Sequence, residues 1–297
     1  MKNDKKIIKK ALLWYNIKAN LGEGPLWVTH SKELLWVDIK GGLVYAINAI
    51  TRVNNVIYKG NKPSCIVQVS NHEFLIADGH KIALLNLITK NYNEFASLKF
   101  NNLNIRFNDG KADPNSNLWI GTMDKNALHN QGSLYLINHK KKISEKLNNI
   151  TISNGMTWSL DAKTMYYIDT FEAKVYAFDF NEKSEILNQR VIIDVPKELG
   201  MPDGMTIDNN GNLWIAMWGG FSVICWNPSS GKIIDKIEVE VPNVTCCVFG
   251  GENMDTLFIT TARDGLSSAE LEKYPTSGSV FYTKMNVSGF NSNYFKI

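Results

Sequence analysis

The sequence predicts an all-β protein, a six-bladed β-propeller, on three observations. Short apolar triplets rich in aromatic residues recur along the chain, and a polar turn precedes each one. Their middle residues are 35, 75, 119, 166, 214 and 258, so the successive gaps are 40, 44, 47, 48 and 44 residues. A period of about 45 residues is typical of propellers, in which each repeat is one four-stranded blade. No long amphipathic helix interrupts the series.

Each repeat presents its elements in the same order. The triplet is expected to be a strand, and in most repeats a turn and a second, alternating strand follow it, as in "GLVYAIN" (42–48) and "AKVYAFDF" (173–180). These segments are rich in Val, Ile, Tyr and Phe, which suit half-buried strands. The segment "SSAELEK" (267–273) is at most a short helical turn. The repeats lack the W-D endings of WD40 propellers and the regular Gly-Gly doublets of kelch propellers.

The repeats predict one domain that spans residues 1–297, because blades in a ring bury one another's faces. The basic start "MKNDKKIIKK" (1–10) is expected to be a flexible tail. We expect the strand near "ALLWYNI" (11–17) to pair with the last blade near "SNYFKI" (292–297). That pairing would remove the open strand edges at the seam of the ring.

Composition excludes several classes of partner. Lys and Arg number 32 and Asp and Glu 29, and the net charge of +3 is not gathered into a stripe, so we expect no nucleic-acid partner. No run approaches the roughly 18 apolar residues of a membrane span, and no secretion signal is recognisable, so we expect a cytoplasmic protein without a membrane partner. The four cysteines lack C-x-x-C spacing and are expected to be free and buried.

A set of polar residues recurs at one position of the repeat, eleven or twelve residues before the middle of the triplet. These residues are Glu23, Asn108, Asn154 and Asp203, and each has a glycine nearby. Equivalent residues on the first strands of the blades face the channel at one height, so the four side chains should converge. The alternative interpretation is that "NDG", "SNG" and "PDG" are ordinary turns. Asp109 in particular is expected to form a turn.

Two carboxylates that converge near the axis would repel each other, and a divalent cation would relieve that repulsion. Carboxylate and amide oxygens form a hard ligand set that suits Ca²⁺, Mg²⁺ or Mn²⁺. Zinc more often recruits His or Cys, and none of the five histidines occupies these positions. The residues therefore predict a metal site in the central channel.

Five motifs in order resemble the gluconolactonase/regucalcin family, also called the senescence-marker-protein and luciferin-regenerating-enzyme family. They are "LGEGPLW", "RFNDGKADPNSNLWIGTMD", "SNGMTW", "MPDGMTIDNNGNLWIA" and "FGGENMDTLFITTA", and they run from Leu21 towards the carboxyl end. The resemblance implies a six-bladed propeller with one divalent ion, for which we expect Ca²⁺, with Mg²⁺, Mn²⁺, Zn²⁺ and Fe²⁺ as alternatives. It implies that Glu23, Asn154 and Asp203 are the metal ligands.

The resemblance also assigns substrate contacts, to Asn108 and Arg106. In the animal regucalcin branch a Glu that follows "GTM" helps to hold the sugar, and Asn126 occupies that place here. Asn126 both donates and accepts hydrogen bonds, so it would contact substrate with a different donor pattern.

The function implied by the resemblance is hydrolysis of a sugar lactone to its acid. The substrate would be an aldonolactone similar to gluconolactone, arabinonolactone or xylonolactone, and Asp203 would assist the attack of water. The alternative is a non-catalytic, calcium-binding regulatory propeller similar to regucalcin. We expect a monomer or a weak dimer. No G-x-S-x-G, H-E-x-x-H, P-loop or G-x-G-x-x-G motif supports another chemistry.

Overall fold

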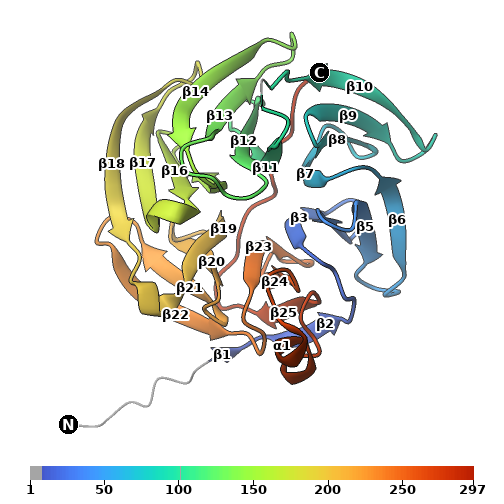
Figure 1. Cartoon of the computed structure of the whole chain (residues 1–297), viewed down its shortest axis with the longest axis vertical. Coiled ribbons are helices and arrows are strands. Elements are labelled where there is room, and N and C mark those ends of the chain that lie inside the picture. The colour runs from blue at the N-terminus through green and yellow to red at the C-terminus, as the bar shows by residue number, and fades with distance from the viewer. Residues whose placement is uncertain (1–8, 101) are drawn as a thin grey trace.

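Six β-sheets are arranged as the blades of a ring in the computed structural model, which describes residues 9–100 and 102–297 (Figure 1). The first strands of neighbouring blades contact each other around the whole ring, from β3 through β7, β11, β15, β19 and β23 back to β3. These six inner strands line the central channel, so the predicted six-bladed propeller is confirmed.

The blades are built from consecutive segments of the chain. Blade one contains β3 (Gly22–Val28), β4 (Glu33–Asp38), β5 (Leu43–Asn48) and β6 (Asn54–Lys59). Blade two contains β7 (Pro63–Gln68), β8 (Glu73–Asp78), β9 (Lys81–Asn86) and β10 (Asn91–Ser97). Blade three contains β11 (Ile105–Ala112), β12 (Leu118–Asp124), β13 (Gly132–Ile137) and β14 (Ile143–Ile150). Blade four contains β15 (Ser153–Trp158), β16 (Thr164–Asp169), β17 (Lys174–Phe180) and β18 (Ile186–Asp194).

Blades five and six include the amino-terminal strands. Blade five contains β19 (Met201–Ile207), β20 (Leu213–Trp218), β21 (Ser222–Asn227) and β22 (Lys232–Glu238), with β1 (Lys9–Lys10) added in parallel to β22. Blade six contains β23 (Val244–Gly250), β24 (Thr256–Thr261) and β25 (Val280–Lys284), with β2 (Leu12–Tyr15) as its outer strand. The helical elements are η1 (Thr170–Glu172), η2 (Lys197–Leu199) and α1 (Ser268–Lys273).

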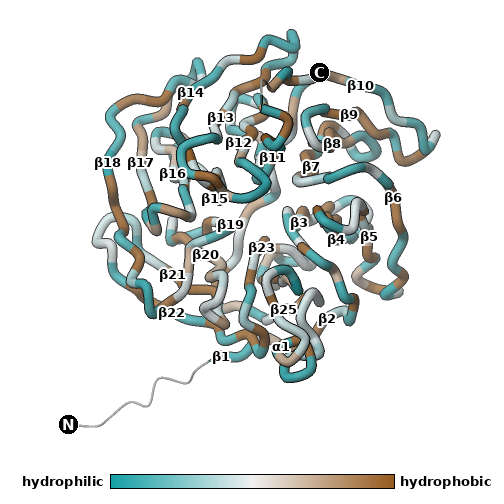
Figure 2. Tube along the Cα trace, viewed as in Figure 1, coloured by the Kyte–Doolittle hydropathy of each residue, from teal (hydrophilic) through white to brown (hydrophobic). Residues whose placement is uncertain are grey.

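The predicted triplets form the second strand of each blade, where they are almost wholly buried. Hydrophobic stretches lie within the strands, and the turns around the outside of the ring are largely hydrophilic (Figure 2). The segment 267–273 forms the short helix α1 behind a capping box of Ser267 and Glu270, as the sequence indicates. Among the described residues no helix is long and apolar enough to cross a membrane.

The repeated string "NLWI" has a local physical cause. In blade three Asp113 accepts hydrogen bonds from the backbone N–H of Asn117 and from the indole Nε1 of Trp119, both at 2.8 Å. Asp208 binds the corresponding groups of Asn212 and Trp214 in blade five, both at 2.9 Å. The aspartate therefore shapes the turn and at the same time satisfies a buried indole N–H, whose desolvation would otherwise be costly.

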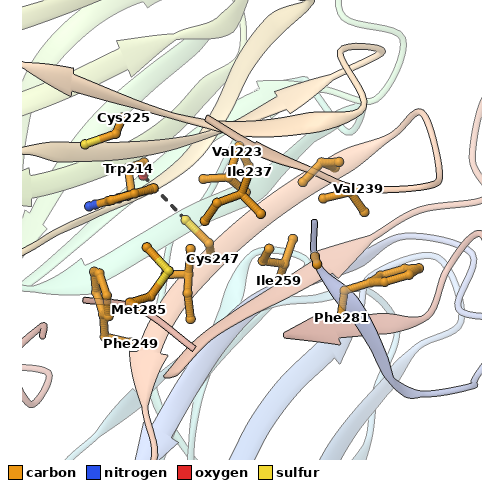
Figure 3. Packing of buried hydrophobic residues seen from close by; sticks show 14 of the residues in the cluster. Trp214, Val223, Cys225, Ile237, Val239, Cys247, Phe249, Ile259, Phe281 and Met285 are labelled. Atoms are coloured by element: carbon orange, nitrogen blue, oxygen red, sulfur yellow. Dashed lines mark hydrogen bonds between the residues drawn. The ribbon is translucent and has the colours of Figure 1, made fainter. Parts of the chain in front are cut away.

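Neighbouring blades pack through apolar side chains, as the interface of blades five and six illustrates (Figure 3). Trp214 and Val223 from blade five contact a cluster that includes Phe249 and Ile259 from blade six. The thiol of Cys247 donates to the carbonyl oxygen of Trp214 at 3.4 Å. Full burial of each large side chain contributes about 1.5–3 kcal/mol, so such interfaces stabilise the ring. All four cysteines are buried and none forms a disulfide within the described residues, as predicted.

Two expectations for the chain ends need correction. The seam is closed by β2 against β25, with Leu12 opposite Tyr282, and not against the segment 292–297. Strand β25 pairs with β24 on one edge and with β2 on the other, whereas the last residues bond singly to the end of β7 and to the turn after β11. The expected flexible tail covered residues 1–10, but Lys9 and Lys10 form strand β1. The rest of that expectation, residues 1–8, lies outside the described residues.

The segment 285–297, which we call the carboxyl-terminal strap, crosses the middle of the ring and ends beside β10 (Figure 1). It bonds to the last residues of inner strands or to the turns that follow them, in five blades. The bonds join Ser288 to Asn209, Gly289 to Met254, Asn291 to Thr29, Asn293 to Ala112, Phe295 to Gln68 and Lys296 to Ser116. The Phe295 side chain is 1% exposed and packs beside Phe95, which explains the apolar pattern of this end.

Candidate metal centre

The four residues predicted to converge lie near the beginnings of inner strands, at the end of the channel opposite the strap. Their strands depart there from regular pairing with the second strands. The register shifts lie between Glu23 and Leu26, Phe107 and Gly110, Ser153 and Met156, and Pro202 and Met205. A bulge redirects a side chain, so Asn108, Asn154 and Asp203 lie within irregular backbone that differs from the ladders around it.

The glycines of the three Asx-Gly motifs allow close approach of neighbouring strands. A Cβ on Gly155 would lie 2.5 Å from the carbonyl oxygen of Asp203, and one on Gly204 would lie 2.3 Å from the Cys246 sulfur. Neither glycine has a positive φ angle, unlike Gly24 at 51°. The motifs are therefore strand features, and the alternative interpretation of ordinary turns is wrong for them.

Buried aspartates at the ends of second strands hold the loops that lead into the site. Asp38 accepts hydrogen bonds from the N–H groups of Asn20 and Leu21, both at 3.0 Å, just before Glu23. Asp169 binds Thr151 and Ile152 in the same way, both at 3.0 Å, just before Asn154. Sequence analysis did not identify this role. Its signal is the Asp that ends four of the triplet strands, at positions 38, 78, 124 and 169.

Arg106, Asn108 and Asn154 form one chain of hydrogen bonds. Nη1 of Arg106 donates to Oδ1 of Asn108 at 2.7 Å, and Nδ2 of Asn108 donates to Oδ1 of Asn154 at 3.3 Å. Asn108 also donates to the carbonyl oxygen of Ser153 at 2.8 Å. Arg106 is only 7% exposed. The structure thus brings together two of the three predicted substrate residues, Arg106 and Asn108, and one predicted ligand, Asn154.

Thr170, which sequence analysis did not identify, fixes the orientation of Asn154. Nδ2 of Asn154 donates to Oγ1 of Thr170 at 2.8 Å, and that hydroxyl donates to the carbonyl oxygen of Pro202 at 2.7 Å. The amide nitrogen is therefore directed at Thr170, and Oδ1 is left facing Asn108. Thr170 follows Asp169 immediately, so the same turn holds both the loop and the side chain.

Three carboxyl groups are buried together in the channel: Glu23, Asp109 and Asp203. Burial, and then the charge of Asp109, raise the pKa of Glu23 from 4.5 to about 8. Burial, followed by the charges of Glu23 and Asp109, raises the pKa of Asp203 well above its ordinary value, against the opposing effect of Asn154 and the Gly204 N–H. Asp109 lies in strand β11, so the expected turn at this residue is not formed.

The residues fit a hard divalent cation. Oδ1 of Asp203 is buried and has no hydrogen-bond partner among the described residues, and Glu23 accepts one hydrogen bond, from the N–H of Gly24. Two ionised carboxylates in this position would be costly without a cation. The described part of the chain contains no group of three His, Cys, Asp or Glu side chains arranged to hold a metal, so the candidate set requires the amide oxygen of Asn154.

Asn126 stands apart from this cluster. It is exposed in the turn after β12, where its N–H donates to Oδ1 of Asp124 at 2.7 Å. In the described structure no hydrogen bond joins Asn126 to Arg106, Asn108 or the candidate ligands. It lies at the channel end where the inner strands begin, so contact with substrate stays a prediction.

A cavity of about 560 Å³ extends through the channel from the level of Asp109 to the strap. Gly24, Lys111 and Cys246 line it towards the carboxyl cluster, and Phe290 and Asn293 of the strap line its other end. Arg106 and Asn126 do not line it. Glu23, Asn154 and Asp203 do not line it either.

The fold and this channel define a class of protein. Residues 21–263 match the model of the SMP-30/gluconolactonase/LRE-like region, and the chain belongs to that family. Regucalcin from Oryctolagus cuniculus is 34% identical over 278 residues, which cover 91% of this chain and 93% of the relative. YvrE of Bacillus subtilis, provisionally named a sugar lactone lactonase, is 32% identical over 281 residues, which cover 94% of this chain and 96% of the relative.

Solved structures agree with this assignment. A luciferin-regenerating enzyme superposes with a TM-score of 0.89 at 30% identity and covers 97% of this chain and 100% of its own. A protein from Agrobacterium tumefaciens described as a calcium-binding protein, regucalcin, superposes with a TM-score of 0.92 at 26% identity, with 98% of each chain covered.

Proposed function

We propose that this protein is a metal-dependent hydrolase that opens a sugar lactone, of the aldonolactone kind, to the sugar acid. The main support is the position of a buried arginine–asparagine pair directly beside a buried cluster of carboxyl and amide oxygens. The cluster of carboxyl and amide oxygens suits a cation, and the arginine–asparagine pair suits a substrate. Membership of a family that includes gluconolactonases in its name is consistent with this reaction.

Glu23, Asn154 and Asp203 would hold the ion, and we propose Ca²⁺ first because all their donor atoms are oxygens. A divalent cation bound there supplies Lewis acidity, which polarises the lactone carbonyl and stabilises the negative charge that develops on its oxygen.

The protein's own groups would position the substrate and move the proton. Asp203 would accept a proton from the attacking water as the water oxygen bonds to the carbonyl carbon. It would return that proton to the ring oxygen when the carbon–oxygen bond of the lactone breaks, so the product is a hydroxy acid. Arg106, Asn108 and Asn126 would bind the sugar hydroxyls.

The test is acid release from D-glucono-1,5-lactone, L-arabinono-1,4-lactone and D-xylono-1,4-lactone, measured above the uncatalysed rate. We expect turnover to vanish after chelation and to return with Ca²⁺. Asp203→Asn should lower kcat at least about 100-fold, the lower end of what a positioned general base contributes. The exposed Asp194→Asn is the matched control and should turn over normally.

A second function is favoured by one observation: several relatives are named regucalcin, and one solved relative is described as calcium-binding. Under that alternative the chain binds Ca²⁺ without catalysis. Calorimetric Ca²⁺ binding together with no acid release from any lactone would overturn the hydrolase and support the regulator. The buried Arg106 beside the cluster argues for the hydrolase, because holding an ion needs no cation next to it.

A further inference from the structure

The irregular pairing at the candidate metal centre recurs in all six blades, and not only in the four that carry the predicted residues. In every blade one pair joins the second strand to the inner strand just before the register shifts. These pairs are Asp38–Gly22, Asp78–Pro63, Thr122–Phe107, Asp169–Ser153, Met217–Pro202 and Thr261–Val244. The residues that follow the inner-strand partners therefore stand at one height of the channel, and they are Glu23, Ser64, Asn108, Asn154, Asp203 and Thr245.

Two hydroxyl residues, Ser64 of blade two and Thr245 of blade six, thus complete the ring of side chains at this height. A close contact between neighbouring strands supports the equivalence of Ser64. A Cβ on Gly24 would lie 3.4 Å from the carbonyl oxygen of Ser64, and one on Gly155 would lie 2.5 Å from the carbonyl oxygen of Asp203. Ser64 therefore lies against blade one as Asp203 lies against blade four.

The two hydroxyls differ in their hydrogen bonds. The hydroxyl of Thr245 donates to the carbonyl oxygen of Gly22 at 2.6 Å and also contacts the hydroxyl of Thr260 at 2.9 Å. It is therefore engaged in holding the backbone beside Glu23. Ser64 is only 2% exposed, and its Oγ is buried without a hydrogen-bond partner in the described part of the chain. A buried hydroxyl without a partner is costly, so a native structure that keeps one calls for an explanation.

The position of Ser64 in the ring supplies a functional explanation. Its blade lies three places from that of Asp203 in a ring of six, so the two residues stand across the channel from each other. Oδ1 of Asp203 is also buried without a partner among the described residues. Asn108, beside Ser64 in the ring, already uses its amide donor on Ser153 and Asn154. The ring thus leaves an unused acceptor on one side and an unused hydroxyl donor on the other.

We propose that the hydroxyl of Ser64 donates a hydrogen bond to the carbonyl oxygen of the lactone, which makes Ser64 a further catalytic residue. This inference rests on the proposed function. The bond would strengthen as the attacking water bonds to the carbonyl carbon and negative charge develops on that oxygen. Ser64 keeps its proton, and no covalent bond forms or breaks at its Oγ. Because Ser64 stands at the height of the candidate ligands, it contacts the reacting group, whereas Arg106 stands two residues nearer the start of β11.

The experiment removes this hydroxyl and a matched one elsewhere. Ser64→Ala should lower kcat by about 100-fold, the lower end of what one such donor contributes, with little change in KM. The substrate is whichever of D-glucono-1,5-lactone, L-arabinono-1,4-lactone and D-xylono-1,4-lactone the wild type opens fastest. Ser277→Ala is the control, since Ser277 is 1% exposed and its Oγ is likewise buried and unpartnered, but it lies outside the ring. It should keep the wild-type kcat.

Two measurements without substrate separate this role from others. In chelator, urea unfolding should show Ser64→Ala to be at least as stable as the wild type, because the substitution removes a buried hydroxyl that has no partner. Calorimetry should show the same Ca²⁺ affinity for Ser64→Ala as for the wild type, because the proposed ligands are untouched.

The outcomes that overturn the proposal are distinct. A wild-type kcat in Ser64→Ala, or an equal loss in Ser277→Ala, would overturn the role of Ser64 and leave the lactonase standing. Ca²⁺ binding weakened about tenfold or more would make Ser64 a ligand of the ion instead. Lower stability in chelator would show that the hydroxyl already has a structural partner. No hydrolysis of any lactone by the wild type would overturn the lactonase, and this inference with it.

Discussion

Replacing Glu23 with Gln should stabilise the metal-free protein and destabilise the metal-loaded one. The substitution keeps the shape of the side chain and removes one of the carboxyl groups buried together in the channel. Because burial and Asp109 raise the pKa of Glu23 from 4.5 to about 8, ionisation of this group opposes folding when no cation is present.

The sign of the effect follows from proton linkage. A carboxyl group with a raised pKa in the folded chain contributes its stability fully below the ordinary value of 4.5 and loses it as the pH rises towards 8. The difference between these values, at 1.36 kcal/mol for each pH unit, corresponds to an upper figure of about 5 kcal/mol. An incompletely bonded buried amide in the variant costs about 1–3 kcal/mol. At pH 8 the metal-free variant should therefore be about 2–4 kcal/mol more stable than the wild type.

Metal should reverse this order. A ligand at 1,000 times its Kd stabilises a protein by about 4.1 kcal/mol, which exceeds the advantage of the metal-free variant, and the variant should gain little because it has lost a ligand. The assay is urea unfolding at pH 5 and pH 8, in chelator and in excess Ca²⁺. A metal-free variant at pH 8 that is less stable than the wild type, and that gains equally from Ca²⁺, would refute the assignment of Glu23 as a carboxylate held for a cation.

Three further outcomes are expected. Ca²⁺ binding should weaken as the pH falls below 8 and should release protons, because ionised Glu23 is the binding form; identical calorimetric heats in buffers of different ionisation enthalpy would contradict this. Thr170→Val should weaken Ca²⁺ binding about 10–100-fold because it frees Asn154, and Thr170→Ser should restore it, whereas a purely structural role would leave calorimetric affinity unchanged. Phe295→Ala should cost about 3–5 kcal/mol in urea unfolding, while Phe290→Ala at 52% exposure should cost little; equal losses would show that the strap packs differently.

Most of the fold could be predicted from the sequence because its signals are local and repeated. The triplets mark second strands, since each blade buries that strand from both faces. The partner of β2 could not be predicted in this way. The last residues carry Tyr294 and Phe295 among polar neighbours, but their backbone forms single bonds, from Phe295 to the end of β7 and from Lys296 to the turn after β11. Sequence patterns report which side chains are buried and not which backbone groups they lie beside.

The candidate ligands could be predicted from the sequence, but the residues that hold them in place could not. The phase of the repeat identifies Glu23, Asn154 and Asp203 as residues at one height of the channel. The roles of Thr170 and Asp38 could not be found in this way, because each depends on a hydrogen bond to another strand or loop.

The distribution of the candidate ligands over blades one, four and five has a consequence for assembly. No partial ring that lacks one of these blades can hold the ion with all three side chains, and the first blade meets the sixth only where the ring closes, at the seam that β2 seals against β25. Binding of the ion would therefore indicate that all the blades have been synthesised and that the ring has closed. A circularly permuted chain, opened between any two blades and rejoined at the present ends, should still acquire its ion, whereas a nascent chain that stops after blade four should not.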